Sequence, residues 1–312
     1  MDVLKKMINC VPQYRVIIFP ESGTPLPVKE NHTELEIGFG NGEFTVQYAK
    51  AHPEILLYGI EISQACVLRC ARRAAGLDNL KIINTDARHM LPELFEDQSL
   101  NKIIMQFPCP WPGNAHAHRR VTAKDFSDRL AAVLKVQGVF EMLTDDKDYA
   151  NEVWKVLGSH EALNPEDFII NPARSITTKY ERKWLEQGKE IFKLTFRKIK
   201  SFTVLRRTSQ EMHIKIKKQI TEENVAALKN FSGKDPEKKS FWKFGRFFIE
   251  GNNNEKNIFL LEALTSDDEF EQKFFIHIAP RDEGFLIRPD KNSNVFLTPA
   301  VRSALNDAAE KL

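Results

Sequence analysis

The chain has 312 residues, of which 42% are hydrophobic and 28% are charged, the balance of an ordinary globular protein. Its formal net charge is only +2, so the overall charge does not by itself indicate a nucleic-acid partner. No apolar run approaches the roughly 20 residues that span a bilayer, and the N-terminal segment lacks the apolar stretch and cleavage site of a signal peptide. We therefore predict a cytoplasmic protein with no membrane association.

The four cysteines, Cys10, Cys66, Cys70 and Cys109, are too few and too scattered for a disulfide framework. Cys66 and Cys70 lie four residues apart on a predicted helix, which raises the question of an iron–sulfur site. The position where a third cysteine would complete such a motif holds Arg73. We interpret both cysteines as helix packing residues.

From residue 33 the chain alternates between short apolar segments and amphipathic stretches. The predicted strands cover residues 33–39, 56–62, 80–84, 103–107, 138–143 and 191–198. The predicted helices cover residues 44–51, 63–75 and 122–135, with Ser63 as an N-cap and Gly76 at a helix end. This alternation predicts an α/β fold, a Rossmann-like parallel sheet with helices on both faces. Ligands of such sheets bind at the carboxyl ends of the strands.

After Lys200 the pattern changes to segments that alternate apolar and polar residues, at 201–208, 239–250, 257–264 and 273–280, with a helix-like stretch within 212–231. We predict two domains, residues 1–200 and residues 201–312, the second a small α+β module. From Phe196 to Glu250 there are fourteen Lys or Arg and six Asp or Glu, whereas residues 251–312 have seven and eleven. Such an asymmetry orients a polyanion in some proteins and is a solvated helix face in others.

The sequence EIGFGNG, from Glu36 to Gly42, joins a predicted strand to a predicted helix. Glycine lets the backbone turn tightly and approach a ligand that a Cβ atom would exclude. A dinucleotide fingerprint would place its third glycine at Glu43, whereas here the glycines are Gly38, Gly40 and Gly42. The carboxylate of Glu36 is unsuited to a pyrophosphate and suits a cofactor with an ammonium group. The loop resembles motif I of the class I S-adenosylmethionine-dependent methyltransferases.

Two further acids follow the next two predicted strands. Glu61 ends the second strand, where a carboxylate can accept hydrogen bonds from both ribose hydroxyls, as it also does in NAD-binding proteins. Asp86 follows the third strand and is placed to accept a hydrogen bond from an adenine amino group. Each acid taken alone is better explained as a solvated loop residue. Three acids at successive strand ends beside a glycine loop favour a cofactor site.

Residues 107–120, FPCPWPGNAHAHRR, combine rigid and cationic groups. The prolines restrict the backbone, Trp111 can stack on a base, and Arg119 and Arg120 can bind phosphate. His116 and His118 could be metal ligands, but no further His or Cys lies near them in the sequence, and RNA-facing or structural roles fit better.

These motifs together resemble the TrmB family of tRNA (guanine-N7-)-methyltransferases. The resemblance is carried, over roughly residues 33–197, by the segments 34–44 (ELEIGFGNGEF), 59–63 (GIEIS), 84–88 (NTDAR), 107–121 (FPxPWP…HxHRRV), 143–146 (LTDD) and 177–181 (TTKYE). It implies a class I methyltransferase fold, S-adenosylmethionine as the cofactor, and tRNA as the partner. The usual target of the family is N7 of the variable-loop guanosine at tRNA position 46.

The resemblance also implies roles for individual residues. The cofactor would be bound by Glu36, Gly38, Gly40, Gly42, Glu61, Asp86 and Ala87. The tRNA would be bound by Asp145, Thr178, Lys179 and Glu181, to which the stacking and phosphate-binding residues Trp111, Arg119 and Arg120 are added. No metal site is predicted, and the sequence leaves a monomer and a homodimer equally open.

The segment departs from the family pattern at two positions. Cys109 stands where the family usually has a catalytic or guanine-positioning Asp, and Gly113 stands where it usually has Lys. N7 of guanine carries a lone pair in the ring plane and needs no general base, so orientation and stabilisation of the cationic product dominate. We therefore predict that Asp145, at the end of the fifth strand, performs both tasks, and that Cys109 is not a nucleophile.

Three alternatives remain open. The departures at Cys109 and Gly113 are compatible with a homologue that binds tRNA without catalysis. An NAD-dependent oxidoreductase is a further interpretation, which the glycine spacing and the segment 107–120 argue against. The C-terminal module either contacts RNA or is a stabilising extension with a small phenylalanine core. Its candidate RNA-contacting residues are Arg206, Arg207, Lys215, Lys217, Lys218, Trp242, Lys243 and Arg246.

Overall fold

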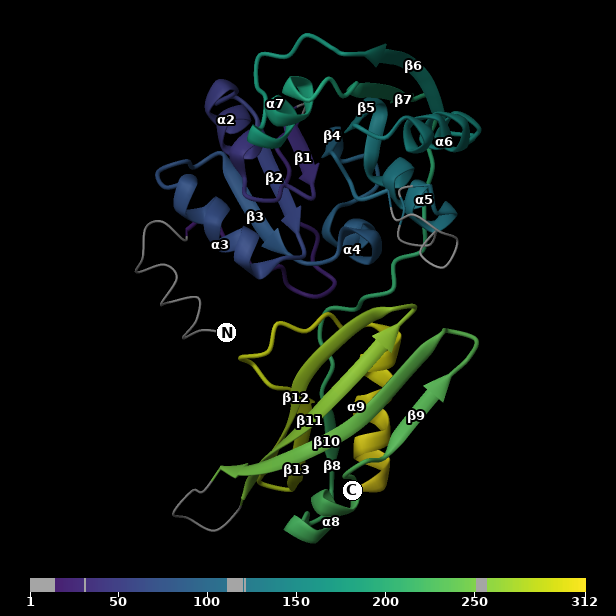
Figure 1. The fold of residues 1–312 in the computed structure, drawn as a ribbon. Coiled ribbons are helices and arrows are strands. Elements are labelled where there is room, and N and C mark those ends of the chain that lie inside the picture. The colour runs from purple at the N-terminus through teal and green to yellow at the C-terminus, as the bar shows by residue number, and fades with distance from the viewer. Residues whose placement is uncertain (1–14, 31, 111–119, 121, 251–256) are drawn as a thin grey trace. The chain divides into compact units, whose positions relative to one another are not determined.

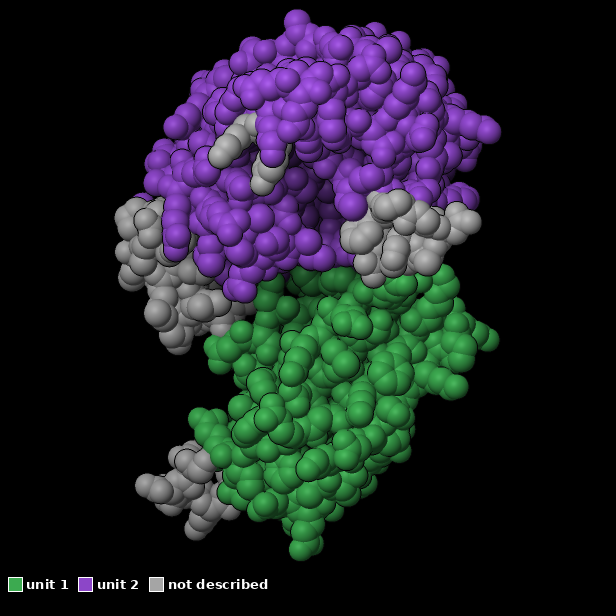
Figure 2. Space-filling view, viewed as in Figure 1, with its two compact units in different colours: residues 1–6, 21–24, 207–312 green, residues 7–20, 25–206 purple. Residues whose placement is uncertain are grey.

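A computed structural model describes residues 15–312 except residue 31, residues 111–119, residue 121 and residues 251–256. The described chain divides into two compact units, coloured separately in Figure 2: a first unit of residues 15–20 and 25–206, and a second unit of residues 21–24 and 207–312. The division between Arg206 and Arg207 lies a few residues beyond the boundary expected at Lys200. The sequence did not indicate that residues 21–24 belong with the second unit, where the Ser22 hydroxyl donates to the Ser209 carbonyl at 2.7 Å.

The first unit is built on a seven-stranded sheet of order β3-β2-β1-β4-β5-β7-β6 (Figure 1). Its strands are β1 (Thr33–Ile37), β2 (Leu56–Glu61), β3 (Leu80–Asn84), β4 (Leu100–Gln106), β5 (Leu134–Thr144), β6 (Leu163–Ile170) and β7 (Phe192–Lys198). The first five strands pair in parallel, as predicted, but β7 runs antiparallel to both of its neighbours. The predicted strand at 191–198 is therefore present in the opposite direction, and β6 beside it was not predicted.

Both faces of this sheet are covered by helices, because the strands are apolar on both sides. Leu57 packs in a cluster with residues of the two helices that follow β1 and β2, whereas the ring of the next residue, Tyr58, meets Phe95 on the opposite face at 5.3 Å. Successive strand residues point to opposite faces, so the sheet needs both layers. The helices are α2 (Glu43–Ala51), α3 (Gln64–Arg73), α4 (Ala87–Leu94), α5 (Lys124–Val133), α6 (Lys147–Gly158) and α7 (Lys179–Glu186).

Helix α5 ends earlier, and β5 begins earlier, than the sequence predicted. A buried lysine explains where the helix ends: the Nζ atom of Lys198 donates to the carbonyl of Leu134 at 2.6 Å and to that of Ala132 at 3.2 Å. These carbonyls belong to the C-terminal turn of α5, which has no helical partner for them. Burial lowers the pKa of the Lys198 ammonium to about 8.

The second unit is a six-stranded antiparallel sheet of order β8-β13-β12-β11-β10-β9, with helix α9 packed against one face (Figure 1). Its elements are β8 (Ile214–Ile216), α8 (Glu222–Ala227), β9 (Ser232–Asp235), β10 (Ser240–Glu250), β11 (Ile258–Asp267), β12 (Phe270–Arg281), β13 (Gly284–Pro289) and α9 (Pro299–Lys311). The inner sheet face and α9 share one core, which includes Phe244, Phe259, Phe274 and Leu305.

Two expectations for this region were wrong. Trp242 is a core residue, only 6% exposed, and its indole nitrogen donates to the Asp307 carboxylate of α9 at 2.8 Å, so it does not stack on RNA. Residues 201–208, expected as a strand, are irregular. The sequence analysis also did not find α9. No helix among the described residues is long and apolar enough to cross a membrane.

Candidate functional site

The carboxyl ends of β1 to β5 meet at one edge of the first unit's sheet, where nearly all the predicted site residues of this unit lie. The glycine loop leaves β1 and enters α2 through three glycines with positive φ, of which Gly42 is the N-cap. A Cβ atom on Gly42 would lie 2.3 Å from the Sγ atom of buried Cys70, so only glycine lets α2 and α3 approach this closely. Burial raises the pKa of the Cys70 thiol to about 12, in keeping with the predicted packing role.

Gly38 and Gly40 differ from Gly42, because nothing lies within 4 Å of an ideal Cβ atom on either of them. Their backbone therefore borders open space at the strand ends. The Gly40 amide donates to Glu61 Oε2 at 2.9 Å, and the Ser63 amide donates to Glu61 Oε1 at 2.8 Å. Each carboxylate oxygen accepts more than one hydrogen bond, so Glu61 is held in place with acceptor capacity left for hydroxyl groups.

A cavity of about 320 Å³ opens beside Glu61. Its walls come from the ends of β1 to β4 and from α4, α5 and α6, and include Ile60, Glu61, Asp86, Met105 and Cys109. Apolar side chains with a few convergent polar groups are typical of a small-molecule site. The cavity brings Glu61, Asp86 and Ala87 together, as the sequence predicted.

Asp86 is the N-cap of α4 and accepts from the Arg88 amide at 2.9 Å. Its other oxygen pairs with the Arg88 guanidinium at 2.6 Å. Ala87 begins the helix immediately behind this carboxylate. The ion pair with Arg88, which the sequence did not suggest, fixes the orientation of the Asp86 carboxylate at the cavity wall.

The second part of the site lies on the other face of β1, around Glu36. This side chain is 2% exposed and its Oε2 atom has no hydrogen-bond partner. Burial raises the pKa of Glu36 to about 7, against the opposing effects of the Thr45 hydroxyl and the Arg174 guanidinium. A buried carboxylate oxygen without a hydrogen bond lowers the stability of the protein unless a ligand supplies that hydrogen bond.

Two more buried polar atoms without partners, Thr45 Oγ1 and Gln106 Nε2, occur beside Glu36. Thr45 faces the carboxylate from α2, and Gln106 lies two residues beyond Ile104, the partner of Glu36 in the β1–β4 register. One unpaired acceptor beside two hydroxyl or amide donors is complementary to an α-amino acid zwitterion, which offers an ammonium and a carboxylate.

The segment after β6 contacts this edge of the sheet through Arg174. Arg174 donates to Glu181 Oε2 on α7 at 2.5 Å and to Gln106 Oε1 at 3.0 Å, and its guanidinium lies 5.4 Å from the ring centre of Phe44. Because the Gln106 oxygen faces Arg174, its amide nitrogen must point elsewhere. The sequence analysis missed Arg174 and Gln106; an arginine shortly before the TTKYE segment was the available signal.

The predicted substrate residues fall into different surroundings. Thr178 and Glu181 form a capping box at the start of α7, and Glu181 is 2% exposed, so its carboxylate faces Arg174. Asp145 follows β5 and pairs with Lys189 at 2.7 Å. Arg120 pairs with Glu152 at 2.9 Å and donates to the Pro110 carbonyl at 3.0 Å, so it braces the proline-rich segment.

Several predicted positions lie outside the described residues: Trp111, Gly113, His116, His118 and Arg119. The side chain of Lys179 also lies outside them. Cys109 is exposed and lines the cavity. Within the described part of the chain, no three His, Cys, Asp or Glu side chains are grouped so that they could hold a metal ion.

The strand order, the glycine loop and the acids at successive strand ends define the class I methyltransferase fold. A family model described as putative methyltransferase matches residues 30–194. The chain is 34% identical to a tRNA (guanine-N(7)-)-methyltransferase of Thermotoga maritima, over 89% of this chain and 88% of that protein. It is 31% identical to the protein of the same name from Aquifex aeolicus, over 92% and 96%. The chain belongs to the TrmB family of tRNA (guanine-N7-)-methyltransferases.

Other relatives of the same name align over about half of this chain; that of Nitrosococcus oceani is 36% identical over 53% of this chain and 70% of its own. Among solved structures, the 16S rRNA (adenine(1408)-N(1))-methyltransferase of Catenulisporales acidiphilia matches 58% of this chain and 99% of its own, at 16% identity and a TM-score of 0.43.

S-adenosylmethionine is the cofactor of this family, and the residues present fit it. Glu61, Asp86 and Ala87 would hold its adenosine in the cavity. The unpaired Glu36 oxygen would accept from its ammonium, and Thr45 and Gln106 would donate to its carboxylate.

The raised pKa of Glu36 predicts a pH-dependent affinity for S-adenosylmethionine. In the ligand-free protein, the raised pKa of Glu36 means that protonation of this carboxyl stabilises the folded state. This stabilisation is fully present below pH 4.5 and is lost as the pH rises through about 7. Binding of an ammonium needs the carboxylate, so below pH 7 it must release a proton. We expect the Kd, measured calorimetrically from pH 5 to 7, to rise by about tenfold per unit of decreasing pH.

Glu36→Gln should bind weakly at every pH and lose this slope. It should also raise the free energy of unfolding of the ligand-free protein at pH 8 by on the order of 1–3 kcal/mol, because it removes a buried charge. Glu54→Gln, at an exposed position, is the matched control. A wild-type Kd that stays constant from pH 5 to 7 would contradict this assignment.

The charge of Arg174 predicts at which pH the affinity for S-adenosylmethionine reaches its midpoint. Arg174→Met removes a cation that lowers the pKa of Glu36, so the midpoint of cofactor binding should move to higher pH, by on the order of one unit. Arg182→Met removes a cation from the same region, one that pairs with Glu43 at 3.1 Å, and should leave the midpoint unchanged. Equal profiles for the two variants would show that Arg174 is only a structural contact.

Proposed function

We propose that this protein transfers a methyl group from S-adenosylmethionine to N7 of a guanine in tRNA, and that the guanosine at position 46 of the variable loop is the target. The observation that carries the proposal is the 34% identity to a protein of that name across both units. The unpaired groups around Glu36 and the cavity beside Glu61 support it, because together they suit both ends of the cofactor. A tRNA substrate also agrees with the predicted cytoplasmic location.

The proposed reaction needs no general acid or general base from the protein. When bound, S-adenosylmethionine would supply a sulfonium methyl group: as the N7 lone pair forms the C–N bond in line, the C–S bond breaks and its electron pair stays on the sulfur of the S-adenosylhomocysteine that leaves. The protein must hold the guanine ring in the right direction, and good orientation lowers the barrier by roughly 7–11 kcal/mol. It must also stabilise the positive charge that develops on the base, for which a carboxylate is suited.

Asp145 is our candidate for both tasks. It follows β5 directly, at the edge where the cavity opens, and Lys189 holds its Oδ2 atom. Lys189 is itself half exposed, so its ammonium can move into solvent when a cationic base replaces it. Thr178, Lys179, Trp111, Arg119 and Arg120 are proposed to contact the tRNA. For Glu181 we propose an indirect role, since its buried carboxylate holds Arg174 in place.

Transfer of labelled methyl groups to unmodified tRNA, followed by nucleoside analysis, tests the proposal. Formation of 7-methylguanosine is expected. Binding of cofactor and tRNA without transfer would instead favour the non-catalytic homologue.

Asp145→Ala should lower the turnover number on saturating tRNA by about 10²- to 10³-fold, the effect typical of removing one electrostatic contact to a transition state. Cofactor affinity should stay within about twofold of the wild-type value, because Asp145 does not line the cavity. Asp148→Ala removes an exposed carboxylate three residues away and should leave turnover unchanged. Unchanged turnover in Asp145→Ala would refute the assignment.

Replacement of Cys109 separates positioning from nucleophilic catalysis. N7 attacks the methyl group directly, with no covalent bond between enzyme and base, so Cys109→Ser and Cys109→Ala should retain methylation within about tenfold. Mass spectrometry of the protein during turnover should detect no adduct at Cys109. Loss of all activity in both variants, with normal folding and cofactor binding, would make the thiol essential.

A further inference from the structure

The face of the second unit's sheet that is turned away from α9 carries a cavity. Strand alternation places Phe244, Phe259 and Phe274 in the core and leaves the intervening residues on this open face. The cavity has a volume of about 490 Å³, within the range of small-molecule sites. It is lined by residues of β10 to β13 and by the turn after β13.

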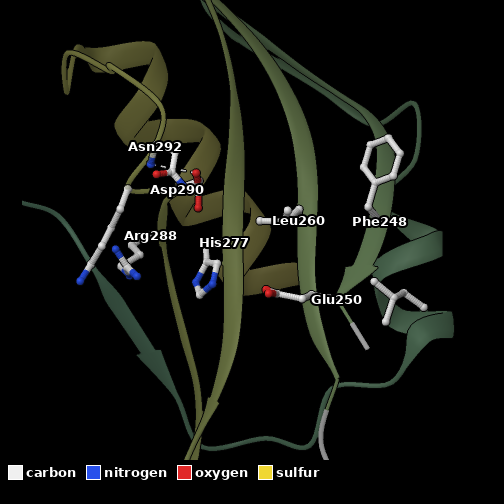
Figure 3. Close-up of a pocket in the computed structure, with 9 residues that line it drawn as sticks. Phe248, Glu250, Leu260, His277, Arg288, Asp290 and Asn292 are labelled. Atoms are coloured by element: carbon white, nitrogen blue, oxygen red, sulfur yellow. Dashed lines mark hydrogen bonds between the residues drawn. The ribbon is translucent and has the colours of Figure 1, made fainter. Parts of the chain in front are cut away.

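The floor of the cavity is a row of four side chains, one from each of four adjacent strands. Phe248 pairs with Leu260, Leu260 with His277, and His277 with Arg288 in the strand register. Figure 3 shows His277 between Arg288 on one side and Leu260 on the other. Phe248 and Arg288 are three strand spacings apart, about 14 Å, which matches two consecutive nucleotides of an extended strand.

The two ends of the row have different chemistry. At one end, Phe248 is 46% exposed, its ring meets Phe275 edge to face at 5.8 Å, and the Arg246 guanidinium lies 5.8 Å from its centre. Arg246 therefore lies over one face of the ring and leaves the other face for a ligand. At the other end the cationic Arg288 and Lys291 line the cavity together with the carboxylate of Asp290.

The cations of this face differ in whether they have a carboxylate as an ion-pair partner. Arg246 and Lys273 both pair with Glu262, at 3.6 and 2.8 Å. Arg288, in contrast, has no carboxylate within ion-pair distance among the residues that the structure describes. Between the ends, His277 Nδ1 is buried without a hydrogen-bond partner and Glu250 presents a carboxylate to the cavity. The site therefore combines a stacking surface, an acceptor for amino groups and an uncommitted cation.

We propose that this open-face cavity binds two consecutive unpaired nucleotides of the RNA substrate, with the base of one against Phe248 and the phosphate of the next at Arg288. Stacking on an aromatic ring next to a cation that holds the backbone is how single-stranded nucleic acid is commonly bound. A duplex presents no base face to Phe248, and an acidic peptide would leave the exposed ring without a partner. The inference rests on the proposed function, which supplies RNA as the partner.

Binding of labelled, unmodified tRNA to the full-length protein tests the inference, measured by fluorescence anisotropy between 50 and 200 mM KCl. Phe248→Ala and Arg288→Ala should each weaken binding by about fivefold or more, and Arg288→Ala should reduce the slope of log K against log salt by about 1. The turnover number on saturating tRNA should not change. A short single-stranded RNA should displace the tRNA better than a duplex of equal length.

Matched controls come from the same unit. Phe241→Ala removes a similarly exposed ring, 41% exposed, from the other end of β10, and Lys229→Ala removes an exposed cation outside the cavity; both should bind like the wild type. If Phe248→Ala unfolds, Phe248→Leu keeps an apolar side chain while removing the aromatic face, and the same loss is expected. The inference is overturned if the cavity variants bind tRNA as the controls do, or if the duplex competes as well as the single strand.

These readouts separate the inference from the proposed function. Wild-type protein that binds tRNA through Phe248 and Arg288 but forms no 7-methylguanosine would count against the methyltransferase activity alone. Formation of 7-methylguanosine with unchanged RNA binding in both cavity variants would count against the cavity alone.

Discussion

The guanidinium of Arg174 connects three elements of the first unit, α7, β4 and α2, that come from distant parts of the chain. It pairs with Glu181 on α7, bonds Gln106 at the end of β4 and lies over the ring of Phe44 on α2. Removing one partner of a buried ion pair typically costs about 3–5 kcal/mol, because the remaining charge is left without compensation. The arrangement of α7 over the strand ends therefore depends on this cation, and so does the direction in which the Gln106 amide points.

Near Arg174 lie buried polar groups whose hydrogen bonds are not all satisfied within the protein. Glu36, Thr45 and Gln106 each keep a buried atom without a partner, although most buried polar atoms in proteins have one. Such atoms lower the stability of the free protein and are retained where a ligand restores their hydrogen bonds. Loss of stability at a binding site is the usual cost of preorganisation. The same atoms indicate which end of the cofactor lies here, since a lone acceptor beside two donors suits an ammonium next to a carboxylate.

The sequence predicted the parallel part of the sheet well, and it predicted that the glycine loop and the acids lie at the strand ends, because local patterns specify both. Glycine spacing and acids at strand ends are short-range signals, and Ser63 is the N-cap of α3 as predicted. The antiparallel direction of β7 depends on long-range pairing with β5 and β6, which no local pattern contains. Arg174 and Gln106 were missed for the same reason, since 68 residues separate them along the chain. Trp242 was misassigned because exposure cannot be read from residue type: its indole is paired with Asp307 on a helix that the sequence analysis did not find.

The division into two units also separates two physical tasks. The described residues that line the cavity beside Glu61, and those around Glu36, belong to the first unit. The second unit has a core of its own between the sheet and α9, so its open face is not needed to stabilise that core. Phe248 on that face lines a cavity together with Leu260 and Arg288, which fits a role in binding better than an isolated exposed ring does. Under the proposed function, contacts there would act on how tightly RNA is held and oriented, while attack by N7 would depend on groups at the strand ends of the first unit.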